Sequence, residues 1–243
     1  TTDFNKGQWY HICATFDDTA NEEKLYIDGT LLYTGTNSAY SYNGVTSVTL
    51  GQARNDFAGN GLAGSPQGKG AFRDLHIVSG AANTPPSGGS SAIVPTSNSK
   101  LLLFTTGSLA DLSGTGCDIS MHSAGNVLVE VNDRIGPYDN AKYSATGGGG
   151  SIYFDGTGDR ISVAGSSDFQ FGTDPFTINF WYFSQDASGN FTLFETSRDA
   201  SGSWNPNGRI QAFHSVGTMS FYVTDTSGTD ISPSGPAYFS TSA

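Results

Sequence analysis

Short runs in which apolar and polar residues alternate, separated by turn-forming residues, make up most of this chain. Such alternation is typical of β-strands with one buried face, and Gly, Asn, Asp and Ser are typical of the turns between strands. The clearest runs are 9–16, 24–27, 46–50, 72–78, 151–154, 160–163, 176–183, 191–195, 208–214 and 219–223. No segment shows a sustained helical stripe. The pattern therefore predicts an all-β sandwich or jelly roll.

The strongest local signal is the Asp28-Gly29 pair, which lies between the apolar runs 25–27 and 30–33. A two-residue hairpin turn needs positive φ at both positions, and Asp and Gly tolerate it. The pair therefore predicts a β-hairpin. Residues 81–95 contain Pro-Pro and Gly-Gly pairs among serines, so we expect an extended surface connection there.

Composition narrows the possible partners. The 243 residues include 22 acidic and 11 basic side chains, for a formal charge of −11, and 16 Phe, 11 Tyr and 3 Trp supply enough apolar surface for a core. The negative charge argues against a nucleic-acid partner. No apolar run is long enough to cross a membrane as a helix, so we expect no membrane insertion. Cys13 and Cys117 lack metal-ligand spacing, and a buried free thiol is the expected state of Cys13.

Two groups of segments carry a recognisable pattern: 6–16, 24–29 and 72–78, and 152–156, 159–163, 168–169 and 176–181. They resemble the laminin G-like domain of the concanavalin A-like lectin and glucanase superfamily. Those similar to the second half of that domain are Lys6-Gly7-Gln8-Trp9-Tyr10-His11-Ile12-Cys13-Ala14-Thr15-Phe16, Lys24-Leu25-Tyr26-Ile27-Asp28-Gly29 and 72–78. Those similar to its first half are 152–156, 159–163, 168–169 and 176–181. More narrowly, Thr84-Pro85-Pro86, 99–103 and 155–159 resemble tandem modules of marine phage tail-fibre proteins and bacterial surface proteins. The resemblance implies a concanavalin A-like jelly-roll sandwich.

The two halves stand in permuted order, because the C-terminal half of the module occupies residues 1–95 and the linker with the N-terminal half occupies 96–243. Three arrangements fit this order. The chain closes on itself as a circular permutant, or it is one period of a tandem repeat, or a neighbouring subunit completes each sandwich in a head-to-tail filament. An isolated half would expose unpaired strand edges, which favours the third arrangement.

The sequence offers little catalytic chemistry. Glucanases of the resembled superfamily carry a Glu-x-Asp-x-Glu strand, whereas here Glu195 is a lone carboxylate and Glu22-Glu23 beside Lys24 is expected on a solvated surface. There is no Gly-x-Ser-x-Gly elbow. The four histidines, His11, His76, His122 and His214, lack metal spacing and are expected to be structural or on the surface. We therefore expect no enzyme, no catalytic residue and no metal centre.

Calcium is the one ion that the resemblance allows, because laminin G-like relatives often bind it at the rim of the sandwich. The candidate pairs are Asp155 with Asp159, Asp17 with Asp18, and Asn55 with Asp56. Asp and Asn are also ordinary turn residues, and this interpretation is favoured, so no cofactor is expected.

Carbohydrate binding requires an exposed aromatic ring beside amide and carboxylate groups. Trp9 and Trp181 lie in predicted strands and are expected to be buried. The glycan-binding candidates therefore come from two turn-rich loops: Trp204, Asn205 and Asn207, and Tyr40, Tyr42 and Asn43. The same side chains would equally suit contacts between subunits.

These observations lead to two hypotheses about function. The first is a non-enzymatic structural or adhesive subunit of an extracellular fibre, such as a phage tail fibre or cell-surface filament, whose main partner is another copy of itself. The second is a lectin-like module that binds a host or extracellular polysaccharide. Both place the protein outside the cell, at a cell surface or on a virion.

Overall fold

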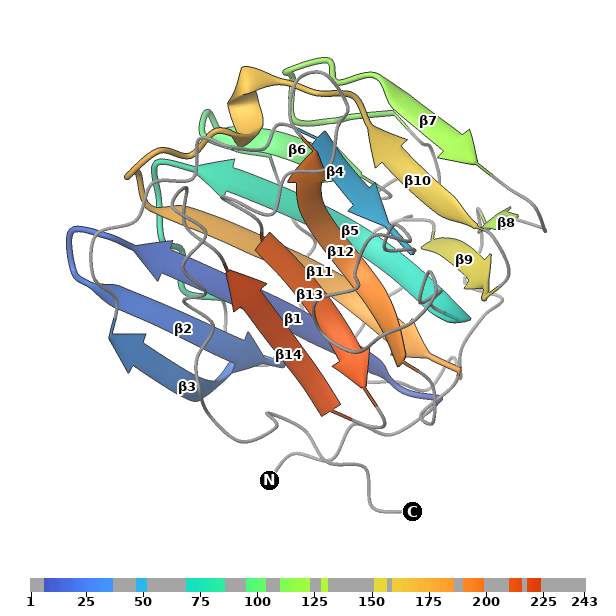
Figure 1. The fold of residues 1–243 in the computed structure, drawn as a ribbon, viewed down its shortest axis with the longest axis horizontal. Helices are drawn as coiled ribbons and strands as arrows, with labels where there is room; N and C mark the ends of the chain where they lie inside the picture. Colours follow the sequence, from blue (N-terminus) through green and yellow to red (C-terminus); the bar gives the residue numbers. More distant parts are fainter. Residues whose placement is uncertain are drawn as a thin grey trace.

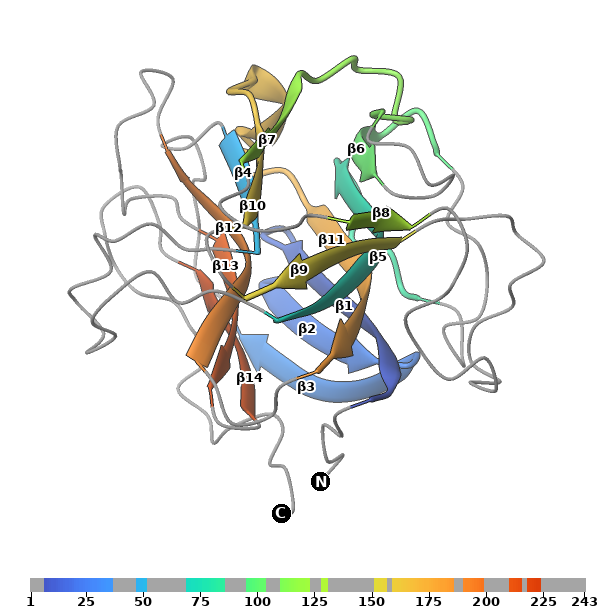
Figure 2. The same ribbon diagram turned by 90° about the vertical axis from the view of Figure 1, so that its right-hand side faces the viewer.

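The computed structural model consists of two antiparallel β-sheets that pack face to face (Figures 1 and 2). It describes residues 7–36, 47–51, 69–85, 95–103, 110–122, 128–130, 151–156, 159–185, 190–198, 210–215 and 218–223. Over these residues the regular structure is β-strand, apart from one short 3-10 turn, η3 (Ser167–Phe169). The prediction of an all-β sandwich is confirmed.

Sheet A is the larger layer, and β11 and β5 lie at its centre. In spatial order its strands are β3 (Thr30–Thr36), β2 (Glu22–Ile27), β1 (Trp9–Asp17), β11 (Phe176–Ser184), β5 (Lys69–Ser79), β9 (Ser151–Asp155) and β8 (Leu128–Glu130), with β6 (Ser99–Leu103) also pairing with β5. Sheet B contains, in spatial order, β14 (Thr218–Val223), β13 (Ile210–Ser215), β12 (Asn190–Arg198), β4 (Ser47–Leu50), β10 (Arg160–Val163) and β7 (Ile119–His122).

The two predicted halves of the chain interleave in both sheets. In sheet A, β11 of the second half lies between β1 and β5 of the first (Figure 1). In sheet B, β4 of the first half lies between β10 and β12 of the second. Residues 1–95 and 96–243 thus contribute strands to the same two sheets, and these strands pair within the one chain.

The core lies between the two sheets, where alternate residues of each strand point inward. On β1 the inward residues are Tyr10, Ile12, Ala14 and Phe16, and the stacked rings of Phe16 and Phe176 lie 4.6 Å apart. The outward face of sheet A carries a second buried cluster of Trp9, Ala71, Trp181 and Phe183. The two tryptophans are thus buried as expected, at 7% and 1% exposure, but outside the main core.

The predicted hairpin is present between β2 and β3. Asp28 and Gly29 have φ values of 50° and 76°, which is the left-handed conformation that a two-residue hairpin turn requires. The Asp28 side chain also accepts a hydrogen bond from the backbone N–H of His11, at 3.0 Å. This bond ties the turn to the neighbouring strand β1. The described part of the 81–95 connection, residues 81–85 and 95, contains no strand, as expected.

One surface expectation is wrong. Glu22 lies on the outward face of β2 and pairs with Lys24, as expected, but Glu23 is only 5% exposed. Side chains alternate along a strand, so Glu23 points into the sandwich with its neighbours Leu25 and Ile27. The Glu-Glu pair therefore has one surface residue and one buried residue.

Candidate functional site

The six glycan-binding candidates named from the sequence lie outside the described residues. Trp204, Asn205 and Asn207 fall between β12 and β13, and Tyr40, Tyr42 and Asn43 fall between β3 and β4. Their role in binding therefore stays a prediction.

A continuous row of polar side chains crosses the outward face of sheet B. We call it the polar strip, and it consists of Ser120, Ser162, Thr49, Glu195 and Gln211, on β7, β10, β4, β12 and β13. Each residue is the direct cross-strand partner of the next, so neighbouring Cβ atoms lie about 5 Å apart. The inward residues beside them, such as Val48, Ile161 and Ala212, belong to the core.

The inner end of the polar strip is buried. Glu195 is 2% exposed and Gln211 is fully buried. The Gln211 side-chain amide donates a hydrogen bond to Thr192 Oγ1 at 3.1 Å, while its carbonyl Oε1 has no hydrogen-bond partner among the described residues. A buried acceptor without a partner is costly, so this oxygen is a place where a donor group would be stabilised.

The outer end of the polar strip is open. Ser162 is half-buried and Ser120, on the edge strand β7, is exposed. The row therefore runs from accessible hydroxyl groups to buried carboxylate and amide groups. This gradient allows a hydroxyl-rich ligand to approach from the β7 edge.

The strip lacks the acid pair that glycoside hydrolysis requires. Glu195 is flanked across the strands by Gln211 and Thr49, neither of which is a carboxylic acid. Glycosidases generally use two carboxyl groups on either side of the scissile bond. Among the described residues, moreover, no three His, Cys, Asp or Glu side chains are grouped so as to hold a metal ion.

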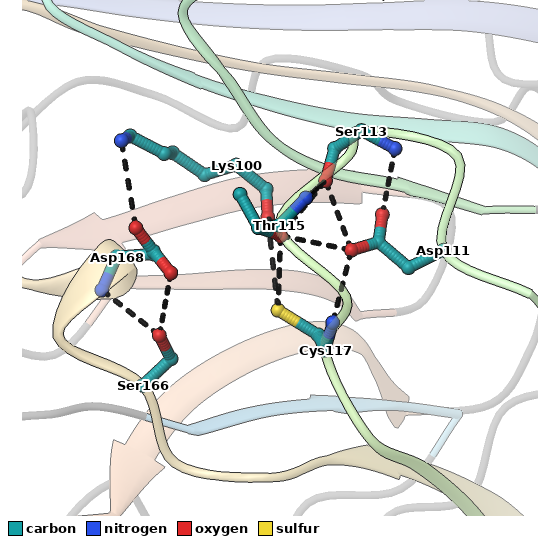
Figure 3. Close-up of polar contacts among 7 residues, drawn as sticks. All are labelled: Lys100, Asp111, Ser113, Thr115, Cys117, Ser166 and Asp168. Atoms are coloured by element: carbon teal, nitrogen blue, oxygen red, sulfur yellow. Dashed lines mark hydrogen bonds and ion pairs between the residues drawn. The ribbon is translucent and has the colours of Figure 1, made fainter.

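A second polar cluster lies at the rim near β6, where Asp111 organises the loop that precedes β7 (Figure 3). Asp111 Oδ1 accepts hydrogen bonds from the backbone N–H groups of Leu102 and Ser113, at 3.0 and 2.9 Å. Its Oδ2 accepts from the hydroxyls of Ser113 and Thr115, both at 2.9 Å, and from the Cys117 N–H at 3.2 Å. Burial alone would raise the pKa of Asp111, but these bonds to the ionised form outweigh it and lower the pKa.

This geometry identifies Asp111 as a structural carboxylate. Three backbone N–H groups donate hydrogen bonds to the Asp111 carboxylate. A calcium site would instead surround the ion with oxygen ligands, and N–H groups cannot act as such ligands. Beside it, Lys100 contacts Asp168 at 3.5 Å, and Asp168 also accepts a 2.7 Å hydrogen bond from Ser166, the residue that caps η3 (Figure 3). The cluster therefore fastens the rim loop to β6.

The calcium candidates that lie among the described residues form ordinary turns. Asp159 Oδ2 accepts a hydrogen bond from the Asp155 N–H at 3.2 Å, and Asp17 Oδ1 accepts one from the Ala20 N–H at 3.0 Å. Asn55 and Asp56 lie outside the described residues. The two described pairs support the interpretation as turn residues.

The two histidines on the outward face of sheet A are buried. Burial lowers the pKa of both His11 and His76 to about 4, so both are neutral at physiological pH. His76 Nε2 lies 2.7 Å from Ser99 Oγ, which also accepts a hydrogen bond from the Thr96 N–H at 2.8 Å. The pair joins β5 to the turn that begins β6, which is a structural role. Cys13 and Cys117 are both free thiols, and burial raises the pKa of Cys13 to about 12.

The family comparison agrees with this architecture. Residues 1–85 match a model of the concanavalin A-like lectin/glucanases superfamily. That segment contains β1 to β5, including the Asp28-Gly29 hairpin, and the two antiparallel sheets of the described residues are consistent with a concanavalin A-like β-sandwich. A search of curated proteins and a search of solved structures each found no match. Among the described residues no helix could span a membrane.

Sequence reasoning missed the two residues that organise these polar sites. Gln211 lies in a predicted strand, but only the cross-strand register places it beside Glu195. Asp111 lies in a region where the alternation of apolar and polar residues is weak. The signal that could have indicated a loop centred on a carboxylate is the spacing of Asp111, Ser113 and Thr115 at every second position.

Proposed function

We propose that this chain is a non-enzymatic adhesive module that binds carbohydrate outside the cell, with the open end of the polar strip, Ser120 and Ser162, as its contact surface. The observation that carries the proposal is the row of Ser120, Ser162, Thr49, Glu195 and Gln211, which ends in a buried amide oxygen without a described partner. Hydroxyl, carboxylate and amide groups are those that bind sugar hydroxyls by hydrogen bonding.

Three further observations support this function. The concanavalin A-like sandwich is compatible with adhesive and lectin-like roles. Glu195 has no carboxylate as its cross-strand partner, which speaks against glycoside hydrolysis. The formal charge of −11 favours uncharged glycans over sulfated or uronic-acid polymers, because like charges repel.

The test is a glycan array of neutral and acidic oligosaccharides, followed by titration of the best ligand against two variants. Ser162→Arg places a long side chain at the open end of the strip, and we expect it to weaken binding at least about tenfold. Thr34→Arg makes a comparable change on an exposed strand residue of sheet A, and binding should stay unchanged. No glycan binding at all, or equal binding by Ser162→Arg, would contradict the proposal.

A second candidate function is that of a fibre subunit, such as a tail-fibre or surface-filament unit that assembles head to tail. The interleaving of the two halves is compatible with it, because the inter-half strand pairs that one chain makes here can also be exchanged between copies of the chain. Adhesion and assembly are compatible, since a fibre can present the same glycan-binding face many times.

A further inference from the structure

Glu23 places a carboxyl group inside the sandwich at the edge of sheet A. It lies on β2, between Phe16 on β1 and Gly35 on β3 in the strand register, and its side chain is on the inward face. Only 5% of the residue is exposed. One carboxyl oxygen, Oε1, accepts a hydrogen bond from the Tyr33 hydroxyl at 3.2 Å, and the other, Oε2, is buried with no hydrogen-bond partner among the described residues.

Strand β3 is built to accommodate this carboxyl group. A Cβ atom on Gly35 would clash with both Glu23 Oε1 and the Tyr33 hydroxyl oxygen. The absence of a side chain at position 35 therefore makes the space in which the carboxyl and phenol groups meet. This contact joins β3 to β2 in addition to the backbone ladder between them.

Few other side-chain contacts stabilise β3 in the sandwich. β3 forms one edge of sheet A, and most of its residues are exposed to solvent, with Leu31 48% exposed. Only Leu32 and Tyr33 pack against the core, and both are partly buried. An edge strand with so few buried contacts belongs to the least stable part of a fold, where local opening occurs first.

Among the described residues, the two strands that flank β2 place no cation beside the Glu23 carboxyl group. Its neighbour on β1 is Phe16, and Tyr33 on β3 contributes a phenol. On the facing sheet, the alternation of β13 places His214 on the inward side. The pKa of Glu23 is raised to about 7 by burial, and the Tyr33 hydrogen bond lowers it in part.

The charged residues next to Glu23 in the chain point the other way. Glu22 and Lys24 form an ion pair on the outward face of β2, and Asp17 is the register partner of Glu22 on β1. They therefore lie across the sheet from the carboxyl group.

We propose that Glu23 is a pH-sensitive latch for the edge strand β3: the neutral carboxyl group keeps β3 docked on β2, and its ionisation releases the strand. A buried carboxylate with one hydrogen bond and no cation is strongly disfavoured, and opening of β3 gives it water. Release uncovers the edge of β2, whose backbone groups would then be available for pairing.

The direction of the pH effect follows from proton linkage. With β3 docked, Glu23 keeps its proton up to a pKa of about 7. With β3 open, Glu23 has its ordinary pKa of 4.5, so between these two values the open state binds fewer protons. The stability of the docked strand is therefore full below pH 4.5, falls as pH rises through 7, and is level above it.

Hydrogen exchange of the full chain tests this latch, with rates corrected for the intrinsic effect of pH. Between about pH 5 and pH 8 the opening constant measured from the β3 amides should rise about tenfold to a hundredfold. Amides of β11, at the centre of sheet A, report global unfolding, which also frees Glu23, so their opening constant should rise by a similar factor from a much smaller value. Glu23→Gln is neutral at every pH, so the dependence of the β3 amides on pH should disappear.

Two further variants separate the latch from a general weakening of the strand. Glu22→Gln changes the neighbouring carboxylate on the outward face and should leave the pH dependence intact. Tyr33→Phe removes the hydrogen bond that lowers the pKa of Glu23, so the transition should move to higher pH. Unchanged β3 exchange across this pH range in the wild type, or a pH dependence that survives in Glu23→Gln, would overturn the proposal.

Discussion

Asp111 and Glu23 are both partly or wholly buried carboxyl groups, and their surroundings move their pKa values in opposite directions. Asp111 accepts hydrogen bonds from three backbone N–H groups and two hydroxyls, so its ionised form is stabilised. Glu23 accepts only one hydrogen bond from the described residues, so burial dominates and its neutral form is favoured. The number of donors around each carboxyl group thus decides which protonation state the fold requires.

Asp111→Asn should loosen the rim loop. The Asn side chain has an NH₂ group in place of one carboxyl oxygen, and this donor would face the N–H and O–H donors of the loop. The expected loss in the free energy of unfolding is about 2 kcal/mol. Because the folded-state pKa of Asp111 is lowered, its contribution is present above the ordinary value of 3.8 and is lost as pH falls through the folded pKa. Denaturation at neutral and acid pH should show that the difference between wild type and variant shrinks below about pH 4. A constant difference would contradict this role.

Strands were predictable here because alternation is a local property of the sequence. Arg160–Val163 has the predicted bounds, and the runs at 9–16 and 176–183 became β1 and β11 with one added residue each. The strands β6, β7 and β8 were missed, because β6 is a continuous apolar run without alternation and β7 and β8 lie where the periodicity of the sequence is weak. Register and burial are not local, which is why neither the depth of Glu23 nor the pairing of Gln211 with Glu195 could be predicted.

The β2–β3 hairpin depends on the backbone conformation of Gly29. Its φ of 76° is strained for a residue with a Cβ atom, so Gly29→Ala should lower the free energy of unfolding by about 1 kcal/mol. Gly29→Asn is the matched control, because Asn tolerates the left-handed region, and its loss should be smaller. Urea denaturation of the three proteins provides the comparison, and equal losses for Ala and Asn would show that the turn conformation is not the cause.

The molecule as a whole joins residues 1–95 and 96–243, and the permuted order of the two module halves stays a prediction from the sequence. Residues 1–85 carry the family match, yet their strands acquire neighbours from the second segment in both sheets. The resemblance of segments between 152 and 181 to the first half of the module remains a prediction, because the match covers residues 1–85. The glycan candidates of the two loops likewise await a binding measurement.

Self-closure makes a specific prediction about size in solution. Because one chain completes these strand pairs, we expect a monomer of 25.4 kDa across a dilution series. Light scattering on a sizing column measures this directly, with electron microscopy of the concentrated sample beside it. A mass that climbs with concentration, or regular fibres, would contradict self-closure and favour exchange of halves between subunits.

The position of β4 has a consequence for synthesis on the ribosome. Leu50 pairs with Ile161 on one side and Phe194 on the other, so β4 leaves the exit tunnel long before either neighbour exists. Between residues 50 and 194 the ribosome adds 194 − 50 = 144 residues, which takes roughly ten to thirty seconds at ordinary rates of translation. Until the end of that interval the apolar strand β4 lacks at least one of its two partner strands, so the nascent chain is a natural client for chaperones that bind exposed β-segments.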